Sequence, residues 1–387
     1  SLITRPTFKG KYKRGNLKKK MLFLLGTVLA TFAIASPNAS EHVEILNATG
    51  GLPPHVVGQF RQPSVFQQTS DGFYLVFDRR GHKIYRVERD RETVTTLVEI
   101  GSESGRIIGA RSFDLGEITD RFAVADAPNG QERIQIFNVD GSLIRSFTLP
   151  GRARPRITFD DSVLSGVGTV EFTGREILMN QPELGGLITR FSLQGTPFHT
   201  FGIFRDTGHE TERDVHLALN SGIPLASADG GYYFVFHAGV PLFRKYDVSG
   251  EFLFERRIQG IELDPIVNTL PTQWSHRSSE IPLIRPSVRT AAVDRDNNLW
   301  VALTTPFIYV YDSDGEKIRT ISLRAAGLLQ PSSLFFPDNT PFVVPKRSSG
   351  VSKPKPVAQN TFSGLCEQFL FLDLLKNMHS SRRYNTF

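Results

Sequence analysis

The stretch RFAVADAPNGQERIQIFNVDGSLIRSFTL, residues 121–149, predicts three short β-strands in succession. Residues 122–125 form an apolar run, residues 133–138 alternate between apolar and polar side chains, and residues 143–149 have a third strand pattern. Asp140-Gly141 joins the last two strands. Such a pair favours a tight type I′ hairpin turn, in which both central residues have positive φ. The stretch therefore predicts consecutive antiparallel strands.

Weaker copies of this pattern fill most of the chain. Each copy has an apolar strand, then an alternating strand, then a turn. The turns recur at intervals of 50 to 65 residues, at Arg89-Asp90, Asp140-Gly141, Gln194-Gly195, Ser249-Gly250 and Asp314-Gly315. Antiparallel units must bury one face and protect their edges, and units repeated at this period do so by packing radially as propeller blades.

The expected fold is all-β: a six-bladed β-propeller of four-stranded antiparallel blades over residues 41–345, with the last blade incomplete or atypical. The sixth unit begins at Gln330-Pro331 and stops after residues 341–345. Residues 43–47 (VEILN) are expected to close the ring by adding a strand to that unit. Residues 346–387 are expected to be a non-propeller tail, whether disordered, an amphipathic helix or the product of a shifted or truncated reading frame.

Charge and cysteine content exclude several classes of protein. The formal charge is +6, but residues 36–345 carry a net charge of −7, because basic residues gather in residues 1–35 and 346–387. The electrostatic footprint of a nucleic-acid binder is therefore missing from the body of the chain, and no nucleic-acid partner is expected. The single cysteine, Cys366, excludes an internal disulfide and a cysteine-based zinc site. A monomer is expected.

The N-terminal region predicts export. Residues 1–20 are a basic extension, residues 21–35 are uncharged and apolar, and Ala33-Ile34-Ala35 stands before Ser36-Pro37. A basic segment, a short apolar segment and a small-x-small site are typical of a secretory signal peptide, so a secreted or periplasmic protein is expected. The alternative is an uncleaved anchor and a membrane-tethered surface receptor, although 15 residues fall short of the ~20 that span a bilayer.

The repeat resembles that of NHL-type and related bacterial secreted six-bladed β-propellers. Residues 124–126 (VAD), 133–137 (RIQIF) and Asp140-Gly141 follow the family pattern. Residues 309–311 with Asp314-Gly315 follow it in part, and the units at 158–203 and 213–260 share strand order and turn but lack its Asp and Arg. The resemblance implies that the Asp126–Arg133 ion pair is structural, as are the repeat positions Asp140, Gly141, Asp314 and Gly315. It leaves function open, because the family includes scaffolds, ligand binders, lyases and lactonases.

The acidic and histidine residues offer two candidate kinds of metal site. Asp294, Asp296 and Asn298 have the spacing that begins a calcium loop, but Leu299 and Thr305 stand where that loop requires Gly and Glu. The segment is therefore expected to be a hairpin turn. Zinc held by histidines from separate blades would draw on the histidines of the second half, which lack metalloprotease spacing: His199, His209, His216, His237 and His276.

An enzyme is the alternative to a binding protein, but catalysis is not expected. A lactonase-type calcium site could use Glu171, Asp229 and Asp294, which lie near the expected inner strands, yet they are better explained as turn and blade-edge residues. No catalytic nucleophile is recognisable. No cofactor is expected. A metal-dependent lyase or lactonase-type hydrolase, with calcium or zinc in the axial channel, remains the competing hypothesis.

Two connections between units are expected to carry the binding site, because long loops on a rigid scaffold often carry function. The longer connection, residues 256–286, holds Trp274, His276, Arg277 and Arg285, and the shorter one holds His209, Arg213 and His216. Trp and Arg are enriched at binding hot spots, although Trp274 could equally pack over a blade while the arginines face solvent. The sequence therefore predicts a binding scaffold that recognises a protein, peptide or glycan through one face of the propeller.

Overall fold

The computed structural model describes residues 43–116, 120–149, 157–159, 162–164, 169–268, 286–329, 331–336, 342–345 and 370–372. The chain divides into two compact units, Ser1–His42 and Val43–Phe387, and all described residues belong to the second. The expected basic extension and signal peptide lie outside the described residues, as does most of the expected tail. No helix within the described ranges is long and apolar enough to cross a membrane.

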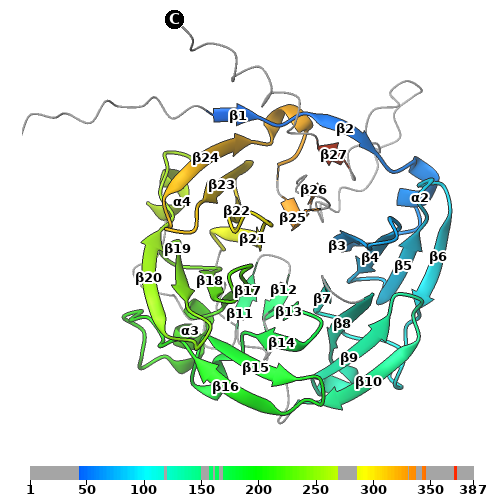
Figure 1. Ribbon diagram of the computed structural model, residues 1–387, viewed down its shortest axis with the longest axis horizontal. Helices are drawn as coiled ribbons and strands as arrows, with labels where there is room; N and C mark the ends of the chain where they lie inside the picture. Colours follow the sequence, from blue (N-terminus) through cyan, green and yellow to red (C-terminus); the bar gives the residue numbers. More distant parts are fainter. Residues whose placement is uncertain are drawn as a thin grey trace, which may run out of the picture. The chain divides into compact units, whose positions relative to one another are not determined.

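Five sheets are each built from four consecutive antiparallel strands, arranged around a common axis (Figure 1). The first contains β3 (Pro63–Gln68), β4 (Tyr74–Asp78), β5 (Lys83–Val87) and β6 (Val94–Val98). The second contains β7 (Ser112–Leu115), β8 (Arg121–Asp126), β9 (Arg133–Asn138) and β10 (Leu143–Thr148). The third contains β13 (Val170–Phe172), β14 (Glu176–Met179), β15 (Ile188–Ser192) and β16 (Pro197–Phe201). The fourth contains β17 (Gly222–Ala226), β18 (Tyr232–Phe236), β19 (Leu242–Tyr246) and β20 (Phe252–Arg257). The fifth contains β21 (Val288–Val293), β22 (Leu299–Leu303), β23 (Phe307–Tyr311) and β24 (Lys317–Ser322).

The predicted β-propeller of four-stranded antiparallel blades is confirmed, but the predicted number of six blades is wrong: the structure has five such blades. After the fifth, only β25 (Pro331–Phe335) and β26 (Phe342–Pro345) follow in the repeat order. They join β27 (Leu370–Leu372) and β2 (Ala48–Gly51) in a sheet of order β2-β27-β26-β25. We call it the closing sheet, because β25 lies between β21 and β3 (Figure 1).

The expected contribution of residues 43–47 to the last unit is also corrected. Strand β1 (Val43–Ile45) pairs in parallel with β24, at the outer edge of the fifth blade. The edge of β24 offers unpaired backbone groups, and the Arg319 guanidinium donates to both carboxylate oxygens of Glu44 at 2.7 and 2.5 Å. Pairing with β24 therefore satisfies both the strand backbone and the Glu44 charge.

The hairpin turns differ from the predicted type. At the Asp140-Gly141 turn, Gly141 has φ of 87°, whereas Asp140 is not among the residues with positive φ. Backbone bonds run from Gly141 N to Asn138 O and from Asn138 N to Ser142 O, at 2.9 Å each. This is a three-residue loop that ends in a left-handed glycine, so the type I′ prediction is wrong. Gly315 has the same role at the equivalent turn, with φ of 81°.

Neighbouring blades pack through their apolar faces. The stacked series Phe77, Phe113, Phe122 and Phe137 crosses from the first blade to the second, with ring centroids 5.2–5.8 Å apart. All four rings belong to one buried cluster. The alternating strand pattern is the reason, because each blade presents one row of side chains to each neighbour.

The inner strands are also joined by hydrogen bonds, and Asp114 links three blades. Its Oδ1 accepts from Gln67 Nε2 of β3 at 2.8 Å, and its Oδ2 accepts from the Phe172 amide of β13 at 2.6 Å. The Gln67 side-chain oxygen accepts in turn from the Leu115 amide at 2.7 Å. These bonds fix the register of β3, β7 and β13 along the axis. The inner strands all begin at the same end of the axis, because four antiparallel strands return the chain to the end where each blade began.

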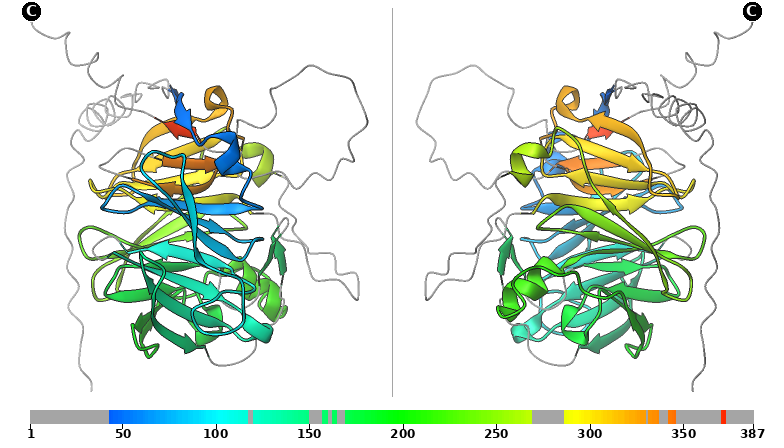
Figure 2. Two further views of the ribbon diagram at one scale, coloured as in Figure 1. Left: turned by 90° about the vertical axis from the view of Figure 1, so that its right-hand side faces the viewer. Right: turned by 90° about the vertical axis from the view of Figure 1, so that its left-hand side faces the viewer.

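The connections that lead from an outer strand to the next inner strand carry extra elements. They are the hairpin of β11 (Ile157–Phe159) and β12 (Ser162–Leu164), α3 (Arg213–Leu219) and α4 (Asp264–Val267). All lie on one face of the blade ring (Figure 2). The remaining short helices are α2 (Pro54–Val57), η1 (Pro128–Gly130), η2 (Pro182–Leu184) and η3 (Arg324–Ala326).

The Asp114 bonds predict that Asp114→Ala lowers the free energy of unfolding by about 2–4 kcal/mol, because it leaves the Gln67 amide and the Phe172 N–H without this acceptor. Urea unfolding of the full chain measures the change. Asp296→Ala, at an exposed turn residue, is the matched control and should stay within about 0.5 kcal/mol of the wild type. Equal unfolding midpoints for the two variants would contradict the role of Asp114.

Candidate functional site

A cavity of about 1660 Å³ runs along the axis of the ring. Its lining comes from the inner strands β3, β7, β13, β17, β21 and β25 and from the loops at their ends. Small or apolar residues line the middle, including Ile223, Leu225 and Ala291. The cavity is therefore formed by every blade and by the closing sheet.

One end of this cavity is lined by four arginines and by His82, whose pKa is lowered by burial. Arg79, Arg80 and His82 come from the loop between β4 and β5, Arg111 stands just before β7, and Arg289 lies near the start of β21. Arg80 is exposed, so this end reaches the surface. We call these residues, together with His237, the cationic end. It is the end at which the inner strands begin, on the face that carries α3 and α4 (Figure 2).

In the first four blades, the residue that ends or follows the second strand holds the start of an inner strand in place. In the first blade, the Asp78 carboxylate accepts from the amides of Arg61, Gln62 and Gly81 at 2.6–2.9 Å. In the third, Asn180 Oδ1 accepts from Gly222 N at 3.0 Å. These contacts fix the backbone at the start of the inner strands, which line the cavity.

Asp126 has the same position in the second blade. Arg133 donates to it through Nε at 2.9 Å and Nη2 at 2.6 Å, and the side chains are 7% and 0% exposed for Arg133 and Asp126. Arg133 also donates to the carbonyls of Ser102 and Arg106, and Asp126 accepts from Ile108 N at 3.1 Å. The pair thus fixes the connection that leads into β7.

His237 occupies the equivalent position in the fourth blade, and it lines the cavity. Its Nδ1 lies 3.4 Å from the carbonyl oxygen of Val288, and its own carbonyl accepts from Ser287 N at 2.9 Å. Burial lowers the pKa of His237 to about 4, and the nearby positive charge of Arg289 acts in the same direction. The imidazole is therefore neutral at pH 7.

Arg205 anchors the connection before α3 to the loop after β18. Its guanidinium donates to the carbonyls of Leu219, Ala238 and Val240 and lies 4.4 Å from the centroid of the Phe236 ring. Burial lowers its pKa to about 10, so the side chain stays charged at pH 7. Three carbonyl acceptors and an aromatic face compensate that buried charge.

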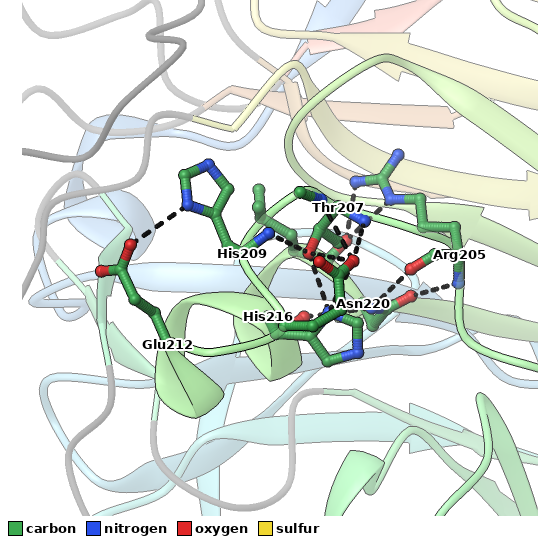
Figure 3. Close-up of polar contacts among 9 residues, drawn as sticks. Arg205, Thr207, His209, Glu212, His216 and Asn220 are labelled. Carbon is green, nitrogen blue, oxygen red and sulfur yellow. Dashed lines mark hydrogen bonds and ion pairs between the residues drawn. The ribbon is translucent and has the colours of Figure 1, made fainter.

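The predicted residues His209 and His216 lie in this same connection (Figure 3). His216 Nδ1 lies 2.8 Å from the Thr207 hydroxyl oxygen, and His209 Nδ1 lies 3.3 Å from Glu212 Oε1. The amide of Thr207 donates to Glu210, and this bond is the main reason that the Glu210 pKa falls to about 2. These contacts are local and give the connection before α3 a defined shape.

The structure separates the predicted binding residues. Trp274, His276, Arg277 and Arg285 lie outside the described residues. His209, Arg213 and His216 belong to the α3 connection, where Arg213 is exposed, and they do not line the axial cavity. Sequence reasoning missed Arg79, Arg80, Arg111 and Arg289. Aligning the repeats on the end of each apolar strand would have placed Arg79 and His237 at one end of the axis.

The acidic residues considered for metal binding have structural partners. Asp294 accepts from Asn298 N, Asn298 Nδ2 and Trp300 Nε1 at 2.8–3.0 Å, which makes the segment a hairpin turn. Asp229 accepts from Lys245 Nζ at 2.8 Å. Glu171 lines the middle of the cavity, on β13. Within the described ranges, no group of three or more His, Cys, Asp or Glu side chains is placed to hold a metal ion.

Comparison with known proteins supports the fold alone. No protein-family model matches the sequence, so the likeness to NHL-type propellers stays a resemblance, and no curated protein matches it either. The PQQ-bound aldose sugar dehydrogenase of Streptomyces coelicolor superposes with a TM-score of 0.51 at 12% identity, covering 86% of this chain and 98% of that one. A virginiamycin B lyase of Staphylococcus aureus, solved in a catalytically inactive form with quinupristin, gives a TM-score of 0.44 at 12% identity, covering 73% and 77%.

The neutral His237 predicts a pH dependence of stability. Its pKa is depressed in the folded state, so between about pH 6.5 and pH 4 the unfolded chain binds a proton that the folded chain does not. Stability should therefore fall with decreasing pH across this window, by up to about 1.4 kcal/mol per pH unit from this group. Urea unfolding at pH 7, 5.5 and 4.5 measures the slope. His237→Gln should reduce it, while His199→Gln, outside the cavity, should leave it unchanged. An unaltered slope in His237→Gln would contradict the assignment.

Proposed function

We propose that the protein is an exported binding protein that holds a protein segment, a peptide or a glycan at the cationic end of its axial cavity. The observation that carries the proposal is the cavity of about 1660 Å³, lined by inner strands from all blades and the closing sheet. Ligand pockets are concave and have a few polar groups at fixed positions. The cavity has this character, because apolar side chains such as Leu225 and Ala291 line its middle together with Asp114 and Glu171, and guanidinium groups line one end.

The surrounding face supports this location. The α3 connection and the loop after β18 are joined by Arg205, and the bridge between Ala238 and Pro286 joins that loop to the start of the fifth blade. A binding surface is more effective when its loops are held in one conformation before the ligand arrives, because less conformational entropy is lost on binding. Long connections on a rigid scaffold are common sites of binding.

The named activities of the structural neighbours belong to those proteins. At 12% identity the likeness carries no information about substrate. The lyase or lactonase hypothesis needs an axial metal ion, and no specific contact among the described residues favours it over binding. We therefore put forward a binding function alone.

The binding site is tested by filling the cavity. Thr290 lines it on β21, and Thr290→Trp should weaken binding of ligands selected on arrays of oligosaccharides and peptides by at least about tenfold, because the indole occupies the ligand's space. Thr95→Trp, on the exposed outer strand β6, is the matched control and should bind as the wild type does. Equal binding by both variants, or an array without any ligand for the wild type, would contradict the proposal.

The export hypothesis has its own test. When the full chain is expressed in a bacterium, the mature protein should begin near Ser36, because Ala33-Ile34-Ala35 fits a signal-peptidase site. Intact mass of the protein from the extracytoplasmic fraction gives the cleavage point. Recovery of uncleaved chain in the membrane fraction would instead support the tethered receptor.

A further inference from the structure

We infer that the ligand carries an anionic group, such as a carboxylate or phosphate, which binds at the cationic end of the axial cavity. This inference rests on the proposed function and names the chemistry of its ligand. Arg79, Arg80, Arg111 and Arg289 supply four guanidinium groups to one end of a single cavity. They come from the first, second and fifth blades, and the closing sheet lies between the fifth and the first, so the fold and not the local sequence gathers them.

The two ends of the cavity differ in charge, because the arginines of the far end, Arg175, Arg190 and Arg295, share that end with acidic residues. Its acidic lining residues occupy the middle and the far end, where the inner strands finish: Asp114, Asp120, Glu171, Glu176 and Asp294. Within the described ranges no acidic side chain lines the cationic end. An elongated ligand would therefore be oriented with its anionic group toward α3, because potentials across a binding site favour complementary charge.

The acidic residues beneath the cationic end are already engaged. Asp78 is fully buried and accepts from three backbone amides, and Asp126 is paired with Arg133. Glu132 is buried near Arg111 and interacts with it electrostatically, but it does not line the cavity. Asp78, which accepts only from backbone amides, and Glu132 are two negative charges beside four guanidinium groups, so a net positive charge remains at this end.

Guanidinium is suited to this role. Its planar donors match the oxygens of carboxylates and phosphates, and such charge-assisted hydrogen bonds are about twice as strong as neutral ones. Arg111 and Arg289 are part-buried, so an oxyanion beside them would be shielded from water and salt. A compact ligand with two or more negative charges would use several of these groups together.

The test uses citrate and inorganic pyrophosphate as separate probes, with calorimetric titration of the full chain. Either probe should bind with a stoichiometry of one, and binding should weaken as salt increases. A double variant, Arg111→Gln with Arg289→Gln, should bind at least about tenfold more weakly. The control carries the same charge change at the far end of the cavity, Arg175→Gln with Arg295→Gln, and should bind as the wild type does. Preference for citrate or for pyrophosphate identifies a carboxylate or a phosphate ligand.

Arg80→Gln keeps the test valid if the double variant unfolds. Arg80 is exposed, so its loss should spare the fold while weakening binding severalfold. If neither citrate nor pyrophosphate binds the wild type, or if the far-end variant loses as much affinity as the double variant, the inference is wrong. If the anion-binding inference is wrong, the proposed binding function is still supported when a neutral array ligand binds and Thr290→Trp abolishes that binding. If no array ligand binds either, both fail.

Discussion

The Asp114 carboxylate is the interaction on which the arrangement of the inner strands depends. It accepts from Gln67 of the first blade and from the Phe172 amide of the third, so one buried charge sets the register of three blades. Apolar packing between blades is large but non-directional, and it would tolerate strands that slide along the axis. Hydrogen bonds between inner strands remove that freedom. The four antiparallel strands of each blade return the chain to the end where that blade began, so the first residues of the inner strands and the adjacent loops form a single rim.

The same constraint explains why the axis holds a cavity. Inner strands that are fixed to one another through their sides cannot collapse inward, and their residues that face the axis line the cavity. The rim is secured separately in the first four blades, by Asp78, Asp126, Asn180 and His237 at equivalent positions. Arg205 also joins the α3 connection to this rim, through its bonds to the carbonyls of Ala238 and Val240. The result is a rigid opening whose charged side chains can differ from blade to blade, and here they are arginines.

The repeat could be predicted from the sequence because its signals are close together in the chain. An apolar strand, an alternating strand and a turn glycine lie within one short stretch. The closing of the ring could not be predicted. Strands β2 and β27 pair although they lie near opposite ends of the sequence, and neither strand has a sequence pattern that indicates its partner. The turn type was predicted wrongly for a physical reason as well. A positive φ at Gly141 alone is enough to close this hairpin, so Asp140 does not need a positive φ. The cationic end was invisible in the linear charge pattern. Arg79, Arg111 and Arg289 are far apart in sequence, and only radial packing brings them to one rim.

The central claim is that ligand is held at the rim where the inner strands begin. Hydrogen–deuterium exchange on the full chain, with and without the ligand selected on the arrays, tests it most directly. The account predicts slower exchange at the amides of residues 109–113 and 286–290, and unchanged exchange at residues 173–176 and 226–231 at the far end of the cavity. Protection confined to the far end, or to the outer strands of the blades, would contradict it.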